Sequence, residues 1–169
     1  MGAYMRNWKQ QESAEYFVQN YADMILRICI AYGLSKEDGF DICQNIYIKL
    51  FEKNISFETI EQEQAYLRKM AVNACKDIKK SWFFKKRTPI DTPIALQSHD
   101  DEYEKTETLE ILRKLPIKYR EVIYFCCIDG LSSEETAILI GKSASCVRKR
   151  LSRARKMIEI EMGGIYVSR

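Results

Sequence analysis

Seven basic side chains and no acidic one fall in the stretch Gly141–Lys156. A helix advances 100° per residue, so Val147, Leu151, Ala154 and Ile158 gather on one side as a stripe that must face a core. The other side then carries small polar and basic residues. Arginine can read guanine edges there, and flanking cations can hold phosphates. The stretch predicts binding of a polyanion, DNA above all, and a merely solvated helix end is the alternative.

Local signals around this stretch predict where its helices begin and end. Ser132 can cap a helix with Glu135 as its capping-box partner, and Gly141 suits the left-handed conformation that ends one. Ser143 can cap the last helix, which should run through Ile158. A short helix, a turn containing glycine and a basic second helix form a helix-turn-helix, whose second helix enters the major groove. The outer face and flanks of this helix carry Ser145, Arg148, Lys149, Arg150, Ser152, Arg153, Arg155 and Lys156.

The helix-turn-helix should be preceded by further helical chain. A helix is expected from about Glu107, with a break at Leu115–Pro116. Pro116 suits a first helical position, because its missing N–H would be unpaired there anyway. The helix should then continue to Ile128, with a turn at Asp129–Gly130.

The first half of the chain shows the same helical spacing of apolar residues. It predicts three helices, over residues 14–28, 36–53 and 64–80, and a loop over residues 54–63. Gly33 should end the first helix, and Ser35 with Asp38 can form a capping box for the second. The second helix should bury Ile42, Cys43, Ile46 and Leu50.

Charge is distributed in blocks along the 169 residues. Residues 1–87 carry 14 basic and 11 acidic side chains, residues 88–109 carry one and six, and residues 110–169 carry 12 and seven. The acidic block also contains two of the three prolines and no helical period, which is typical of a linker. We therefore expect an all-α protein with two small domains. They are an N-terminal helical bundle (1–87) and a C-terminal four-helix domain (107–169), joined by an acidic flexible linker (88–106).

The sequence gives no support for a metal site, a disulfide, a catalytic site or a membrane-spanning segment. The six cysteines form no C-x-x-C pair and lie in apolar helical stretches, so buried reduced thiols are expected rather than a metal site or disulfides. The single histidine, His99, lies among acids. No nucleophile-base pair or glycine-rich phosphate loop appears, so neither an enzyme nor a cofactor is expected. Without a long apolar run or a secretory signal, the chain should be cytoplasmic with no membrane insertion.

Three stretches resemble one known family. "LRKLPIKYREVIYFCCIDGLSSEETAILIGKSASCVRKRLSRARKMI" is similar to the promoter-reading C-terminal domain of bacterial RNA polymerase sigma factors. "DICQNIYIKLF" and "AYLRKMAVNACKDIKK" resemble two helices of their first domain. Nothing between them resembles the middle domain of housekeeping sigma factors. The resemblance, over about residues 12–88 and 107–160, is therefore to the compact extracytoplasmic-function (ECF) group of the sigma-70 family.

This resemblance implies a function and a set of partners. The partners would be core RNA polymerase, through its beta-prime coiled coil and beta subunit, promoter DNA and an anti-sigma factor. The domain over residues 1–87 would be sigma region 2, and the one over residues 107–169 region 4, reading the −35 element. The polymerase-binding residues would be Asp41, Gln44, Asn45, Ile48 and Lys49. The residues for −10 recognition and melting would be Arg68, Lys69, Asn73, Lys76, Lys79 and Lys80, beside a loop over residues 54–63 that holds a flipped base.

Other readings of these features stay open at this point. A conventional helix-turn-helix regulator, with a helical sensing or dimerisation domain, would share the basic last helix. Ile48 could be a stray exposed apolar residue, and the basic stripe on the third helix a solvated face. The cluster Trp82–Phe84 could stack on single-stranded DNA or pack against the domain. Thr136 and Lys142 stand where the family usually has apolar residues.

Overall fold

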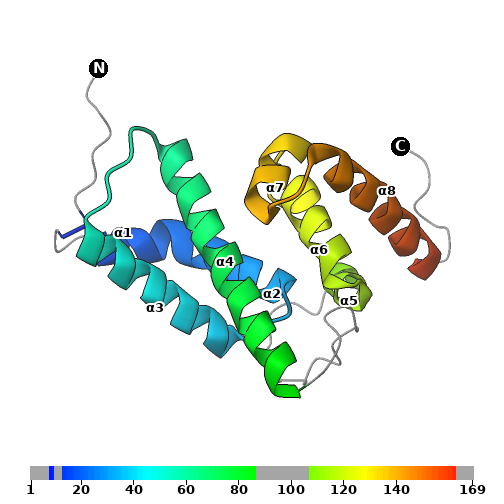
Figure 1. Cartoon of the computed structure of the whole chain (residues 1–169), viewed down its shortest axis with the longest axis horizontal. Coiled ribbons are helices and arrows are strands. Elements are labelled where there is room, and N and C mark those ends of the chain that lie inside the picture. Colours follow the sequence, from blue (N-terminus) through cyan, green and yellow to red (C-terminus); the bar gives the residue numbers. More distant parts are fainter. Residues whose placement is uncertain (1–7, 10–12, 87–106, 163–169) are drawn as a thin grey trace. The chain divides into compact units, whose positions relative to one another are not determined.

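The computed structural model describes residues 8–9, 13–86 and 107–162. Over these residues every regular element is a helix (Figure 1), which confirms the all-helical prediction. The chain divides into two compact units. The first contains the residues up to 79 except 31–33, and the second contains those three and the residues from 80 onward. The predicted linker over residues 88–106 lies outside the described residues.

The first unit begins with a helical stretch that contains a π turn. It consists of α1 (Ser13–Phe17), the π turn (Val18–Ala22) and α2 (Asp23–Ala31). Gly33 follows with a φ of 72°, as predicted for the residue that ends this stretch. The π turn widens the hydrogen-bond step by one residue, so the uninterrupted α-helix expected over residues 14–28 is not what forms.

Helix α3 (Lys36–Lys53) has the predicted start and end. Ser35 Oγ accepts from the Asp38 N–H at 3.1 Å, and the Asp38 carboxylate accepts from the Ser35 N–H at 3.3 Å. This capping box is confirmed. Asn54, in the left-handed conformation with a φ of 46°, ends the helix. The predicted stripe is also confirmed, because the structure buries Ile42, Cys43, Ile46 and Leu50.

Helix α4 (Ile60–Lys86) is longer than expected at both ends. The prediction of a loop over residues 54–63 is wrong, because the helix already begins at Ile60. Thr59 Oγ1 accepts from the Gln62 N–H at 3.2 Å, and Gln62 Oε1 accepts from the Glu58 N–H at 3.1 Å. A threonine followed three residues later by glutamine is a helix-start signal that the sequence carried. The loop therefore contains only residues 54–59.

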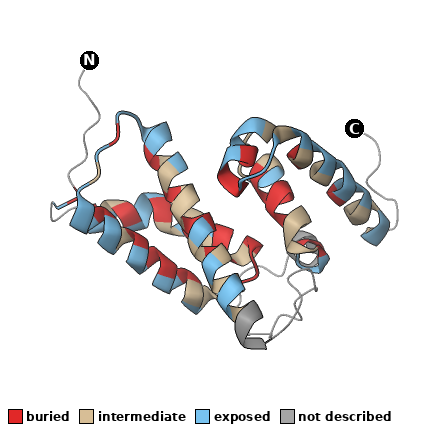
Figure 2. Ribbon diagram, in the orientation of Figure 1, coloured by how far each residue is buried: buried red, intermediate tan, exposed pale blue. Residues whose placement is uncertain are grey.

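The core of the first unit lies between the inner faces of α2, α3 and α4 (Figure 2). Ile25, Leu50 and Leu67 are fully buried there. At one end, Trp8 is also fully buried and meets the Phe17 ring edge-on, with 6.2 Å between the ring centroids. Edge-to-face aromatic pairs add to the stabilisation that burial alone supplies.

The second unit contains four helices over residues 107–161. Its helices are α5 (Glu107–Lys114), α6 (Ile117–Ile123), α7 (Ser133–Ile140) and α8 (Ala144–Glu161). A second π turn, Tyr124–Ile128, extends α6. Pro116 is the N-cap residue of α6, one position before the first helical position that the sequence predicted for it. Helix α8 ends at Glu161, three residues beyond the predicted Ile158.

A buried arginine ties α5 to α6. Arg120 Nε donates to the Leu112 carbonyl at 2.8 Å, and Nη2 donates to the carbonyls of Arg113 and Leu115 at 2.7 and 2.8 Å. Burial, with a smaller contribution from the charge of Arg113, lowers the pKa of Arg120 to about 10. The guanidinium is thus still charged at neutral pH. It gives the carbonyls at the end of α5 a charged donor, in addition to the Leu115 N–H, which donates to the Leu112 carbonyl at 3.2 Å.

A polar pair inside this unit explains one unusual residue. Thr136 is fully buried, and its Oγ1 lies 3.4 Å from Cys126 Sγ. A buried hydroxyl needs a partner, and the Cys126 thiol supplies one for Thr136.

Candidate functional site

The helix-turn-helix is formed by α7 and α8, and its turns are fixed by local chemistry. The Glu135 N–H donates to Ser132 Oγ at 3.1 Å, and the Ser132 N–H donates to the Glu135 carboxylate at 2.8 Å. Gly141 ends α7 with a φ of 73°. Ser143 Oγ then accepts from the Cys146 N–H at 3.2 Å and starts α8. All three predicted signals are therefore confirmed.

Helix α8 presents the two faces expected from its sequence. Val147 and Ala154 are fully buried, while Leu151 and Ile158 pack against the core as half-buried side chains. The exposed residues are Ser145, Arg148, Lys149, Ser152, Arg153, Arg155 and Lys156. Seven of the eight residues predicted to contact DNA thus share a solvent-facing surface.

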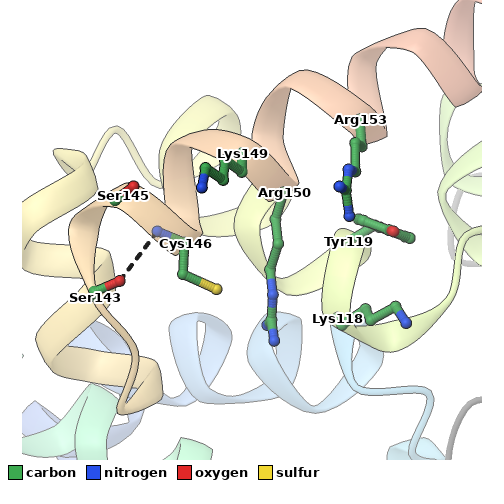
Figure 3. Close-up of a pocket in the computed structure, with 8 residues that line it drawn as sticks. All are labelled: Lys118, Tyr119, Ser143, Ser145, Cys146, Lys149, Arg150 and Arg153. Atoms are coloured by element: carbon green, nitrogen blue, oxygen red, sulfur yellow. Dashed lines mark hydrogen bonds between the residues drawn. The ribbon is translucent and has the colours of Figure 1, made fainter.

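The eighth residue, Arg150, is half-buried, and its side chain extends away from α8 beside that of Cys146 (Figure 3). Its Nη1 lies 2.8 Å from Glu121 Oε1, and the two side chains are only 19% and 8% exposed. Removing one partner of such a pair leaves a buried charge uncompensated. The position of Arg150 therefore favours fastening α8 to α6, and a DNA contact from it stays a prediction.

Arg148 also has an acidic neighbour, which the sequence analysis missed. Its Nη1 lies 2.8 Å from Glu134 Oε1 on α7, and both side chains are more than half exposed. Ion pairs this open to water contribute about 0–1 kcal/mol. The pair therefore holds Arg148 in place only weakly.

Helix α3 carries the residues predicted to bind polymerase. Asp41, Gln44, Asn45, Ile48 and Lys49 are all exposed. Sequence reasoning missed two aromatic neighbours, Phe40 and Phe51, which are 47% and 44% exposed beside Ile48 at 49%. Positions 40, 44, 48 and 51 repeat every three or four residues, and this spacing was the available signal. Together, Phe40, Ile48 and Phe51 form an apolar stripe of the kind that protein interfaces bury.

Helix α4 carries the residues predicted for −10 recognition. Asn73 and Lys80 are exposed, and the remaining four are half-buried: Arg68, Lys69, Lys76 and Lys79. In the loop before α4, Phe57 is buried and lies against Tyr66, with 5.3 Å between the ring centroids. Of the cluster Trp82–Phe84, the side chains of Phe83 and Phe84 lie outside the described residues.

The cysteines are free thiols in three kinds of surroundings. Cys29, Cys43 and Cys75 are buried, Cys126 and Cys146 are half-buried, and Cys127 is exposed. The prediction of buried thiols is thus wrong for Cys127. Cys127 lies in the second π turn, where the wider step changes which side of the helix faces the core.

In residues 8–9, 13–86 and 107–162 no group of histidine, cysteine or carboxylate side chains is arranged to hold a metal ion, and His99 lies outside these ranges. Among the helices that the structure describes, none combines the length and apolar content needed to cross a bilayer.

Comparison with known proteins finds similarity to sigma factors. The family model described as "Sigma-70, region 4" matches residues 105–158. The RNA polymerase sigma factor SigV of Bacillus subtilis is 27% identical over 142 residues, which are 80% of this chain and 82% of that protein. The ECF RNA polymerase sigma factor SigE of Mycolicibacterium smegmatis is 23% identical over 155 residues, 86% of this chain and 60% of that protein.

A solved structure shares the fold. It contains the sigma factor RpoE in complex with the anti-sigma factor NepR from Bartonella quintana. The likeness has a TM-score of 0.71 at 19% identity, over 94% of this chain and 99% of that one. These comparisons agree with the sigma-factor resemblance seen in the sequence: residues 105–158 match region 4 of the sigma-70 family, and over most of its length the chain is similar to RNA polymerase sigma factors, one of them of the ECF group.

Proposed function

We propose that this chain is a promoter-specificity subunit. It binds core RNA polymerase, directs the enzyme to a subset of promoters and assists their melting, in the cytoplasm and without chemistry of its own. The observation that carries the proposal is the capped helix-turn-helix whose exposed face is basic, within the segment that matches sigma region 4. Such a helix fits the major groove, where arginine can read guanine.

The N-terminal and C-terminal domains have different parts in this function. Residues 107–169 take the −35 element through α8, and residues 1–87 bind polymerase and the −10 element. The apolar stripe on α3 supports polymerase binding, with Asp41 and Lys49 as its polar rim. The basic residues of α4 support contact with promoter phosphates.

An anti-sigma factor completes the proposed partners. The solved relatives RpoE and CnrH are each described in complex with a partner protein, NepR and the cytosolic domain of CnrY. The apolar stripe on α3 offers such a partner a surface, and an inhibitor that covers it would exclude polymerase.

Run-off transcription tests the proposal. The full chain is mixed at low salt with core polymerase that lacks its own specificity subunit, and genomic fragments are supplied as template. Transcripts from discrete start sites are expected, with none when the chain is omitted. Failure of the chain to associate with core polymerase would refute the proposal. A conventional regulator would instead bind its operator without polymerase, and no observation on this chain favours that alternative.

A further inference from the structure

Three cysteines lie close together in the core of the first unit. They come from three different helices, Cys29 from α2, Cys43 from α3 and Cys75 from α4. All three are buried, and Cys29 and Cys75 are fully so. The function proposed above uses none of them, although the thiol is a side chain that readily undergoes oxidation and exchange.

Two of these thiols are in contact with each other. Cys75 Sγ–H donates to Cys29 Sγ, with 3.8 Å between the sulfurs, and the two residues are 46 positions apart in the sequence. The sulfurs of a disulfide lie about 2.05 Å apart. Each sulfur therefore has to move by about 0.9 Å, half the difference, to form the bond. Rotation of the two thiols about their Cα–Cβ bonds supplies a movement of this size.

The third thiol makes a different contact. Cys43 Sγ–H donates to the Ala22 carbonyl at 3.8 Å. Burial, with a smaller contribution from the charge of Cys29, raises the pKa of Cys43 to about 12. Cys43 is thus a neighbour of the pair, but its thiol is directed at the backbone. The contact between sulfurs selects Cys29 and Cys75 as the two that can be joined.

The surroundings of the pair decide how it reacts. The hydrogen bond from Cys75 and burial both raise the pKa of Cys29, so the pair is held as thiols at neutral pH. The thiolate is the form that attacks an oxidant, and oxidation is therefore slow at neutral pH and faster in mild alkali. The oxidant must also be small and uncharged to enter the core, as hydrogen peroxide is.

We propose that Cys29 and Cys75 are a latent disulfide site, at which peroxide joins α2 to α4. One sulfur attacks the O–O bond of hydrogen peroxide, becomes a sulfenic acid and releases one water. The other sulfur then displaces the hydroxyl group as a second water. Two thiols and one hydrogen peroxide thus give one disulfide and two waters, and the peroxide gains the two electrons that the sulfurs lose. This inference does not depend on the proposed function.

The cross-link changes the stability of the first unit. In the unfolded chain it closes a loop of 46 positions, which removes conformational freedom from the unfolded state and favours the folded one. Reduction of the bond restores that freedom. Oxidation therefore makes the first unit harder to unfold, and a thiol reductant reverses the change.

Peptide mapping tests the linkage, because trypsin separates the three cysteines into peptides 28–36, 37–49 and 70–76. The full chain is treated with hydrogen peroxide at pH 8, alkylated in urea and digested without reductant. Mass spectrometry should find peptides 28–36 and 70–76 joined, with the mass of both less two hydrogens. Absence of this product, linkage of either peptide to 37–49 instead, or sulfinic acid in place of the disulfide would overturn the proposal.

Thermal unfolding followed by circular dichroism measures the effect on stability. The oxidised full chain should unfold about 10 °C above the same sample after treatment with dithiothreitol. Methionine sulfoxide does not account for the difference, because dithiothreitol leaves it in both samples. Cys127→Ala, which removes an exposed thiol, should keep the difference between oxidised and reduced protein.

Two variants that lack the pair, Cys75→Ala and Cys29→Ala, should lose this difference. Each is compared with its own reduced form, so any stability lost through the substitution itself does not enter the result. If one of them does not fold, the other makes the same comparison. An equal difference in either variant, or none in the wild type, would overturn the assignment of the cross-link to Cys29 and Cys75.

Discussion

Arg148 and Arg155 lie on the same flank of α8 but have different surroundings. Arg148 is paired with Glu134, at the end of α8 nearer the turn, while Arg155 is exposed two turns further along. In a helix-turn-helix the N-terminal residues of the second helix reach base edges, and later ones meet phosphates. The two arginines should therefore contribute to different properties of the complex.

Substitution of the two arginines separates these properties. Arg148→Ala should cost about 1–3 kcal/mol at one base pair of the −35 element and little on promoters already altered there. Arg155→Ala should weaken binding evenly and lower the salt slope by about 1. Affinities of the holoenzyme for single-base promoter variants measure both effects. Equal loss on every variant for Arg148→Ala would contradict its reading role.

The role of a residue was predictable from the sequence where its partners are close in the chain. It was not predictable where the partner is distant in the chain. Ser143 and Gly141 do their work within one helical turn, so their roles follow from the local chain. Arg150 pairs with Glu121, 29 positions away, and only the packing of α8 on α6 brings them together. The helical wheel placed Arg150 on a flank, and it could not tell which flank faces an acid.

At the scale of elements, the corner between α5 and α6 depends on Arg120. Arg120→Ala should lower the free energy of unfolding of the second unit by about 3 kcal/mol, because three hydrogen bonds from a charged group to carbonyl oxygens are lost, two of them buried and one part-buried. Urea titration followed by circular dichroism measures this change. Arg113→Ala, at an exposed position on α5, should change the stability by less than about 0.5 kcal/mol. Comparable losses in both variants would show that Arg120 does not tie the corner.

The thiols buried among α2, α3 and α4 should make the first unit sensitive to alkali. The hydrogen bond from Cys75, at 3.8 Å between the sulfurs, and burial both raise the pKa of Cys29. Burial raises the pKa of Cys43 from its ordinary 9.0 to about 12. Above about pH 9 the folded state keeps protons that the unfolded chain loses, so the free energy of unfolding falls as pH rises.

The expected slope is up to about 1.4 kcal/mol per pH unit for each thiol, and the stabilisation is fully present below pH 9. Urea titrations between pH 8 and pH 10.5 measure it. Cys43→Ala should show a shallower decline, whereas Cys127→Ala, which removes an exposed thiol, should follow the wild type. Parallel declines in all three proteins would assign the effect to other groups.

Some helix boundaries could be predicted from the sequence and others could not. Capping boxes at Ser35 and Ser132 were found because their hydrogen bonds lie within four residues. The start of α4 was missed although Thr59 and Gln62 carried the same kind of signal. The π turns were missed for a different reason. A π turn is locally unfavourable and forms only where the packing of the side chains that it rotates compensates. Tyr21 and Phe125, which lie in the two π turns, are buried in this way.

At the scale of the whole molecule, the proposed function assigns polymerase binding and reading of the −35 element to different units. The all-α fold and the helix-turn-helix were predictable because periodicity, charge blocks and glycine positions agree with one another. The apolar stripe on α3 was only partly predictable. Ile48 was recognised, but Phe40 and Phe51 were not, since an exposed aromatic cannot be told from a buried one until the core is known.

A variant of the stripe should therefore fail at a different step from a variant of α8. Ile48→Glu should weaken association with core polymerase at least tenfold, because a carboxylate must be buried without a partner. Gel filtration with core polymerase measures this step. Arg148→Ala should associate normally and lose selectivity only on promoter DNA. Lys53→Gln, which also changes the net charge by −1 and lies at an exposed position at the end of α3, is the control. Normal association of Ile48→Glu would remove the stripe from the polymerase contact.

The acid beside Arg148 changes what the promoter must offer. The ion pair with Glu134 contributes only about 0–1 kcal/mol, so the carboxylate is a weak competitor that lowers the net gain of Arg148 at every candidate base by a similar small amount. Guanine, with two acceptors in the major groove, can win that exchange, and adenine or thymine has less to offer. Promoters that lack guanine at this position leave Arg148 paired with Glu134. They are then discriminated against without any steric clash.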